Sequence, residues 1–114
     1  GHSFEMAQGS GVTVHIQTEN VPFHKEAWAF ADMGLVPSGA YRNRDYAEAG
    51  VRLTREIARP MQDILYDPQT SGGLLIALPE KDAARCLDEL RQSVPQAAAV
   101  GYVTEKMDAA IYLE

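Results

Sequence analysis

The sequence predicts an α+β fold in which helices pack on a mixed β-sheet. Apolar and polar residues alternate over residues 12–17, an unbroken apolar run extends from Leu74 to Leu78, and apolar residues recur at helical spacing over residues 80–94. A period of two is typical of a strand with one buried face, and a period near 3.6 is typical of an amphipathic helix. With 114 residues, of which 46% are hydrophobic, the chain can build the core of one domain spanning residues 1–114.

The first part of the chain predicts a helix, a strand and a second helix. Residues 2–9 are typical of the end of a helix that stops at Gly9-Ser10-Gly11, and residues 12–16 carry the alternation of a strand. Apolar residues at helical spacing predict the second helix, which Gly34 should end. We expect the aromatic residues of this helix to lie in the core. The residues at helical spacing are Phe23, Ala27, Phe30 and Ala31, and the aromatic residues expected in the core are Phe23, Trp28 and Phe30.

The rest of the chain predicts two more helices, a buried strand, a long helix and a β-hairpin. The run from Leu74 to Leu78 predicts a central strand buried on both faces. The following helix carries one apolar stripe, and the two strands after it are separated by a short polar turn, so this part predicts a ferredoxin-like split βαβ unit. In order, the predicted ranges are 40–49, 60–65 with Pro60 in the first position, 74–78, 80–94, 100–104 and 109–113.

Composition excludes several classes of partner. The formal net charge of −6 argues against nucleic acid. No apolar run approaches the roughly 20 residues that a membrane helix needs, and no signal-peptide pattern is present. The single cysteine, Cys86, cannot form an internal disulfide and favours a reducing cytosol. The chain begins with no Met and within a predicted helix, so we expect it to be a piece of a larger protein.

The most informative segment is a polar loop that leads into the apolar run. Its sequence is Asp67-Pro68-Gln69-Thr70-Ser71-Gly72-Gly73. Proline restricts the backbone, the carboxylate and two hydroxyls offer hydrogen-bonding groups, and the glycine pair permits positive φ and a close approach of a ligand to backbone N–H groups. The same composition also suits an ordinary turn before a strand, and the residues alone leave both interpretations open.

Arginines are the second informative feature. Half of the ten basic residues lie between positions 42 and 59, and all five are arginine. The planar guanidinium suits bidentate contacts to phosphate oxygens, so the cluster predicts a surface that faces phosphate or a partner. A solvated helix face with edge charges is the alternative. The five residues are Arg42, Arg44, Arg52, Arg55 and Arg59.

The residues that most often carry catalysis or bind metals show no such pattern here. His2, His15 and His24 are 13 and 9 residues apart, which matches no metal-ligand spacing. His15 falls on the polar face of its strand, where we expect it to be solvated. Cys86 lies beside the apolar stripe of the long helix and is expected to be a buried packing residue.

Several segments together resemble the C-terminal domain of selenophosphate synthetase (selenide, water dikinase). The signature Asp-Pro-Gln-Thr-Ser-Gly-Gly-Leu-Leu, at residues 67–75, is the most specific of them. The resemblance covers nearly the whole chain, and related enzymes of the aminoimidazole ribonucleotide synthetase-like superfamily share the fold. The other matching segments are Gly1-His2-Ser3-Phe4-Glu5-Met6-Ala7, Gly34 to Ala40 followed by Arg42-Asn43, and Gly101-Tyr102-Val103-Thr104.

This resemblance implies a function for a larger enzyme. That enzyme would convert selenide, ATP and water to selenophosphate, orthophosphate and AMP in the cytoplasm, with Mg²⁺, as a homodimer. The resemblance implies that the family's nucleophile and its partner lysine lie near the N-terminus, and that most of the Mg²⁺-binding aspartates belong to the N-terminal ATP-binding half or its boundary. No catalytic or metal-binding residue is therefore expected in this chain, and the chain alone should be inactive. The resemblance places Asp67, Thr70, Ser71, Gly72 and Gly73 on the wall of the substrate cleft, together with Arg42 and Asn43.

Two alternatives remain open at this stage. The chain could be a packing and assembly module whose loop is purely structural. It could also be the same domain of another superfamily enzyme, of the hydrogenase-maturation, purine-synthesis or thiamine-monophosphate kinase type. The Pro-Gln pair within the loop favours the selenium enzyme.

Overall fold

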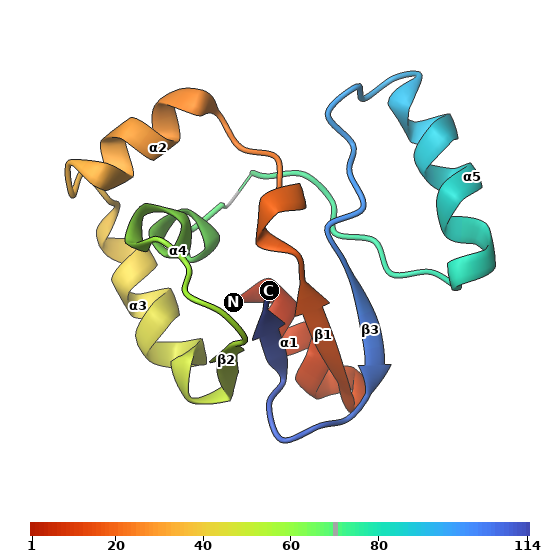
Figure 1. Ribbon diagram of the computed structural model, residues 1–114, viewed down its shortest axis with the longest axis horizontal. Helices are drawn as coiled ribbons and strands as arrows, with labels where there is room; N and C mark the ends of the chain where they lie inside the picture. Colours follow the sequence, from red (N-terminus) through yellow and green to blue (C-terminus); the bar gives the residue numbers. More distant parts are fainter. Residues whose placement is uncertain (70) are drawn as a thin grey trace.

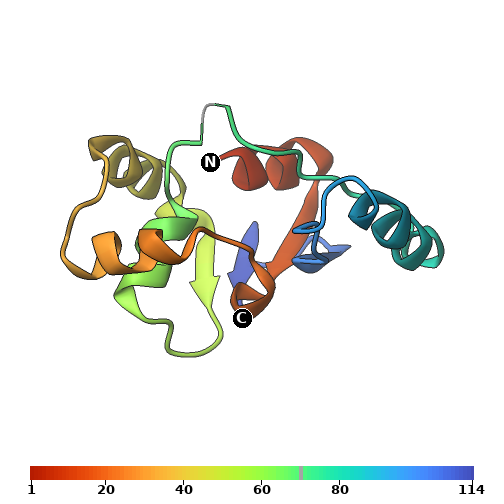
Figure 2. The same cartoon turned by 90° about the horizontal axis from the view of Figure 1, so that it is seen from above.

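The computed structural model describes residues 1–69 and 71–114. It combines α-helices with one four-stranded sheet, so the predicted α+β class is confirmed (Figure 1). The helices α2, α3 and α4 lie beyond one edge of the sheet, and α5 lies beyond the other (Figures 1 and 2). In chain order the elements are α1 (His2–Ser10), β1 (Val12–Ile16), η1 (Thr18–Asn20), α2 (Lys25–Asp32), α3 (Ser38–Ala47), η2 (Glu48–Gly50), β2 (Val51–Leu53), α4 (Arg59–Leu65), α5 (Glu80–Arg91), β3 (Gly101–Glu105) and β4 (Ile111–Leu113).

The sheet has the strand order β2-β4-β1-β3. Strand β1 pairs antiparallel with β3, and β4 pairs parallel with both β1 and β2. The predicted hairpin between the last two strands is therefore wrong, because β1 lies between them. Sequence spacing suggested a local turn, whereas the backbone hydrogen bonds of β3 and β4 go to a strand about ninety residues earlier in the chain.

The core lies on the side of the sheet that α1 covers (Figure 2). Phe4 and Ala7 of α1 are buried there with Ile111 and Leu113 of β4. The helices α3 and α4 complete the cluster with Ala40, Ala47, Met61 and the neighbouring Ile57 and Tyr66. Gly11, with φ 65°, ends α1, and Gly34, with φ 76°, follows α2, as the sequence predicts.

The opposite face of the sheet carries a row of three stacked rings. His15 of β1 lies between Tyr102 of β3 and Tyr112 of β4, with ring centroids 4.5 and 5.2 Å away and planes within 8° of parallel. Its Nδ1 lies 2.8 Å from Glu114 Oε1, and its Nε2 lies 3.1 Å from Thr104 Oγ1. The expectation that His15 is solvated is wrong: the residue is 7% exposed, because its cross-strand neighbours cover both faces of the ring.

The run from Leu74 to Leu78 does not form the predicted central strand. Residues 72–79 pair with no strand of the sheet, and Leu74 is 90% exposed. With this segment outside the sheet, the split βαβ unit predicted for the end of the chain is not formed. The following helix, α5, ends at Arg91 and contains no buried residue, although its apolar stripe is present in the sequence. Cys86 is half-buried rather than buried.

The aromatic residues around α2 also differ from the prediction. Phe23, Trp28 and Phe30 are all exposed, and α2 buries Ala31 instead. Phe23 and Trp28 stack on each other with centroids 6.2 Å apart. Across residues 1–69 and 71–114, no helix is both long enough and apolar enough to span a membrane.

Gly101 is a position where the sheet requires glycine. A Cβ at this residue would overlap the backbone carbonyl of His15, which no side-chain adjustment can relieve. We expect Gly101→Ala to lower the free energy of unfolding by about 1–3 kcal/mol, the usual cost of overpacking. Gly9→Ala is the matched control, because its Cβ would meet no atom within 4 Å and alanine favours a helix. Urea unfolding measures both, and equal stability of the two variants would contradict the strand placement.

The stacked cluster predicts a pH dependence. The hydrogen bond from His15 holds the pKa of Glu114 below its ordinary value, Tyr102 adds to this, and partial desolvation opposes it. A carboxyl whose pKa is lower in the folded state contributes stability above its unfolded pKa, and that contribution is lost as pH falls through the folded pKa. NMR titration should show a higher Glu114 pKa in Tyr102→Phe, and a higher one still in His15→Phe. An unchanged Glu114 pKa in both variants would contradict these hydrogen bonds.

Candidate functional site

Two sequence motifs that are far apart in the chain meet in the structure. A Cβ added at Gly39 of α3 would lie 2.7 Å from Cγ of Pro68, so the start of α3 packs directly against the loop at Asp67 to Gln69. One turn later on α3, Asn43 Nδ2 donates a hydrogen bond of 2.9 Å to the carbonyl oxygen of Tyr66. The loop is therefore held at its start by α3 through both packing and a hydrogen bond.

The local sequence explains how the loop leaves α4. The helix ends at Leu65, and the backbone N–H groups of Tyr66 and Asp67 still bond to the carbonyls of Gln62 and Ile64 at 3.2 and 3.1 Å. Pro68 has no N–H and cannot continue the helix. The Gln69 N–H then bonds to the Asp67 carbonyl at 3.0 Å, so the chain turns at the proline.

Arg42 lies on the same side of α3 as the loop contact, because it follows Gly39 by three residues. Its side chain is exposed and donates to Ser38 Oγ at 3.4 Å. The guanidinium consequently has donors that face solvent beside the loop. Asn43, by contrast, is half-buried and uses its amide to hold the backbone at Tyr66. An ideal Cβ on Gly1 would lie 3.8 Å from Asn43 Oδ1, so the start of the chain is close to the same place.

The glycine pair of the loop does not adopt the positive φ that its sequence suggests. Positive φ occurs at Gly11 and Gly34 in the described residues, and not at Gly72 or Gly73. A Cβ at Gly72 would lie 3.1 Å from the Gln69 side chain, while one at Gly73 would meet no atom within 4 Å. Ser71 is exposed, and Thr70 lies outside the described residues. A side chain at position 72 would therefore require a small shift of Gln69, whereas position 73 is open.

The arginine cluster divides into separate roles. Asp63, which is 7% exposed, accepts hydrogen bonds from Arg44 at 2.7 Å and from Arg59 at 3.1 Å, and Arg44 also lies over the Tyr66 ring at 4.7 Å. Arg55 pairs with Glu19 at 3.2 Å, and Arg52 donates to backbone carbonyls. Arg44 is largely buried and takes no part in a surface, whereas Arg42, Arg52, Arg55 and Arg59 remain exposed. For these four, the phosphate-facing or partner-facing surface stays a prediction.

Sequence reasoning missed Asp63 as the centre of this network. Its spacing of four residues from Arg59 on α4 was an available signal, but its pairing with Arg44 is non-local. Burial raises the pKa of the neighbouring Tyr66 hydroxyl, and the Arg44 guanidinium opposes that rise. Tyr66 stays neutral near pH 7, so the network contains two cations and one buried carboxylate.

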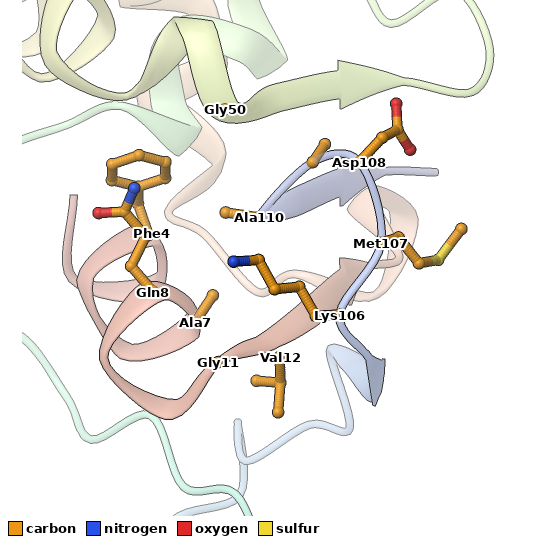
Figure 3. A pocket seen from close by; sticks show the side chains of 11 residues that line it. Phe4, Ala7, Gln8, Gly11, Val12, Gly50, Lys106, Met107, Asp108 and Ala110 are labelled. Atoms are coloured by element: carbon orange, nitrogen blue, oxygen red, sulfur yellow. The ribbon is translucent and has the colours of Figure 1, made fainter.

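A separate hollow of about 360 Å³ lies between α1 and the turn that joins β3 to β4 (Figure 3). The Lys106 side chain reaches across it toward Phe4, and Gln8 lies on the α1 side. None of the predicted site residues lines this hollow. Its full lining is Phe4, Ala7, Gln8, Gly11, Val12, Gly50, Lys106, Met107, Asp108, Ala109 and Ala110.

Metal ligands do not gather near the loop. Over residues 1–69 and 71–114, no group of three or more His, Cys, Asp or Glu side chains is close enough to hold an ion. Asp67 belongs to no such group among the described residues, and Asp63 is already paired with two arginines. The described residues thus do not fit a Mg²⁺ site by themselves.

Comparison with known proteins identifies the class of domain. Residues 1–114 match the family described as AIR synthase related protein, C-terminal domain, and the chain belongs to this family. The three curated relatives described here carry the name selenide, water dikinase. The protein from Clostridium botulinum (strain Eklund 17B / Type B) is 42% identical over 114 residues, which is 100% of this chain and 33% of that protein.

Two further relatives also match nearly all of this chain but only about a third of their own length. "Selenide, water dikinase 2" of Peptoclostridium acidaminophilum is 42% identical over 112 residues, covering 97% of this chain and 32% of the relative. The protein of Pelobacter propionicus is 44% identical over 107 residues, covering 93% and 31%. The chain therefore spans about one third of the length of the curated relatives that it matches.

The contact between Gly39 and Pro68 can be tested by a pair of substitutions. Replacing glycine by alanine inside a helix ordinarily stabilises by about 0.5–1 kcal/mol. Here we expect Gly39→Ala to destabilise instead, because the new Cβ would overlap the Pro68 ring. Adding Pro68→Ala should recover stability, which gives a favourable coupling in a double-mutant cycle followed by thermal unfolding. If Gly39→Ala stabilises to the same extent with and without Pro68, the two motifs are not in contact.

Proposed function

We propose that this chain is the C-terminal domain of a selenide, water dikinase, and that it forms part of the substrate cleft of that enzyme. The observation that carries the proposal is the meeting of two motifs in one place: the start of α3, with Gly39, Arg42 and Asn43, and the loop that begins at Asp67. Relatives that match the chain along its whole length carry that enzyme's name.

The side chains around the loop suggest a division of labour. Asn43 and Gly39 position the loop, since one binds its backbone and the other admits the Pro68 ring. The Arg42 guanidinium and the Ser71 hydroxyl are exposed and can donate to phosphate oxygens. Phosphoryl transfer depends chiefly on positioned donors and cations around the charged group. Asp67, Thr70, Gly72 and Gly73 complete the proposed cleft wall.

The remaining parts of the reaction are assigned to the other two thirds of the enzyme. ATP would bind to an N-terminal half, and Mg²⁺ would be held there, because the described residues of this chain gather no metal ligands. The reaction would yield selenophosphate, orthophosphate and AMP from selenide, ATP and water. In this proposal the intact enzyme is a cytoplasmic homodimer, and the isolated chain is inactive.

The proposal is tested by substitutions in the intact enzyme. We expect Arg42→Gln and Ser71→Ala each to lower turnover by roughly tenfold or more, as is typical when a positioned donor is lost. Because both side chains are exposed, the free energy of unfolding should change by no more than about 1 kcal/mol. Selenophosphate yield and unfolding midpoints measure the two effects.

Arg85→Gln on α5 serves as the control. Arg85 is an equally charged, exposed residue whose 2.8 Å contact is with Glu89 on its own helix. The turnover of the Arg85→Gln enzyme should equal that of the wild-type enzyme. If Arg42→Gln and Ser71→Ala also retained wild-type turnover, the loop would be a structural turn and the chain a packing module.

A further inference from the structure

Arg44 of α3 uses one guanidinium group to reach three partners in the second half of α4 or just beyond it. Its Nη1 donates to Gln62 Oε1 at 3.2 Å, and its Nη2 donates to Asp63 Oδ1 at 2.7 Å. The guanidinium also lies over the Tyr66 ring, 4.7 Å from the ring centroid. The Arg44 side chain is 14% exposed, so water screens these contacts little. A planar, forked cation can combine such hydrogen bonds with a contact to an aromatic face, and an ammonium group cannot.

Neutralising Asp63 does not explain this arrangement by itself. Asp63 also accepts a hydrogen bond of 3.1 Å from Arg59, which lies four residues earlier on the same helix. The carboxylate therefore keeps a cation on its own helix when Arg44 is replaced. The Gln62 carboxamide is likewise held without Arg44, because its Nε2 donates to the carbonyl oxygen of Ile57 at 2.8 Å. What Arg44 adds is a connection between α3 and the end of α4.

Tyr66 is the residue at which this connection reaches the loop. It is buried, its ring lies beneath the Arg44 guanidinium, and its carbonyl oxygen accepts the hydrogen bond of 2.9 Å from Asn43 Nδ2. Two consecutive residues of α3 therefore hold Tyr66, one at the ring and one at the backbone. The loop begins at the next residue, Asp67, while the exposed donor Arg42 belongs to α3 itself. The position of the loop relative to Arg42 thus depends on how Tyr66 is held.

We propose that Arg44 is a positioning residue for phosphoryl transfer in the intact enzyme. It is not itself a candidate donor to substrate, because its side chain is largely buried and its Nη atoms are bonded within the chain. It acts through Tyr66, fixing the loop that carries Ser71 relative to Arg42. This inference rests on the proposed function and adds the residue that sets the geometry of its two donors. Donors act strongly on a charged transition state when they are held in place beforehand, so a loop that moves relative to α3 should lower turnover without unfolding the protein.

Amide hydrogen exchange, followed by NMR in this chain, tests the structural step. The Asp67 N–H bonds to a carbonyl of α4 at 3.1 Å, and the Val14 N–H bonds to a carbonyl beside β4 at 2.9 Å. We expect Arg44→Lys to accelerate exchange at Asp67 several-fold more than at Val14. The reason is that lysine keeps the charge but cannot cover the Tyr66 ring, so the opening is local. Equal acceleration of both amides would indicate a general loss of stability and would overturn the inference.

The catalytic step is tested in the intact enzyme by a double-mutant cycle on kcat/KM for selenophosphate formation. Arg44→Lys should lower kcat/KM several-fold in the wild-type background and by a clearly smaller factor in the Ser71→Ala background, since the loop then has no hydroxyl to position. Tyr66→Leu removes the ring and leaves the pair between Arg44 and Asp63, and it should give the same result. Arg85→Lys, the same substitution at an exposed residue of α5, is the control and should leave kcat/KM unchanged. Assays run well below the unfolding midpoint of each variant keep the folded fraction constant.

Unchanged exchange at Asp67 in Arg44→Lys would overturn the inference. So would an equal loss of kcat/KM from Arg44→Lys in both backgrounds, because Arg44 would then act independently of the loop. If Arg44→Lys and Tyr66→Leu keep wild-type kcat/KM while Arg42→Gln loses turnover, the positioning role falls and the proposed function stands. If Arg42→Gln and Ser71→Ala both keep wild-type turnover, the proposed function falls and the inference falls with it.

Discussion

The structure depends on the insertion of its last strand, β4, between β1 and β2. Ile111 and Leu113 supply the centre of the core, and the backbone at both ends of β4 is tied to distant segments by the Thr13 hydroxyl at Ala109 and the Thr18 hydroxyl at Glu114, each at 2.7 Å. These contacts join residues 96 positions apart. The entropy of closing so long a loop must be overcome before the sheet is complete, so we expect folding to be slow for a chain of this size.

The candidate site depends on that strand through two further connections. Strand β2 pairs with β4, and it is flanked in sequence by α3 and α4. The ion pair between Arg44 and the buried Asp63 then fixes these two helices against each other. A relative shift of the two helices would break the Arg44 contact and leave Asp63 with only Arg59, which lies on its own helix. Gly39 of α3 and Pro68 after α4 come into contact as a result. The start of α3 and the loop after α4 are thus positioned by the sheet, although neither segment contains a strand residue.

Elements whose signals are local could be predicted from the sequence, and elements defined by distant partners could not. The alternation over residues 12–16 and the glycines at positions 11 and 34 indicated β1 and the ends of α1 and α2, since strand pleating and positive φ are properties of a few neighbouring residues. The pairing of β3 with β1, the burial of His15 and the role of Asp63 depend on residues far away in sequence. The apolar residues from Leu74 to Leu78 and Trp28 were predicted to be buried, yet Leu74 and Trp28 are exposed. Apolar composition favours burial but does not specify the surface against which a residue is buried. For the candidate site, the sequence selected the loop and the start of α3 without indicating that they touch.

The candidate site presents its hydrogen-bond donors to solvent. The side chains of Arg42 and Ser71 are exposed, and the start of the loop is held by hydrogen bonds from Asn43 to Tyr66 and from the Asp67 N–H to Ile64. A site on a loop held by a rigid scaffold can present charge-binding groups without an entropic cost of ordering them on binding. Such donors act strongly on a phosphoryl group only when water is excluded, and one open wall cannot exclude it. In the proposed function, the wall that excludes water is supplied by the rest of the enzyme, since the Arg42 and Ser71 side chains are exposed in this chain.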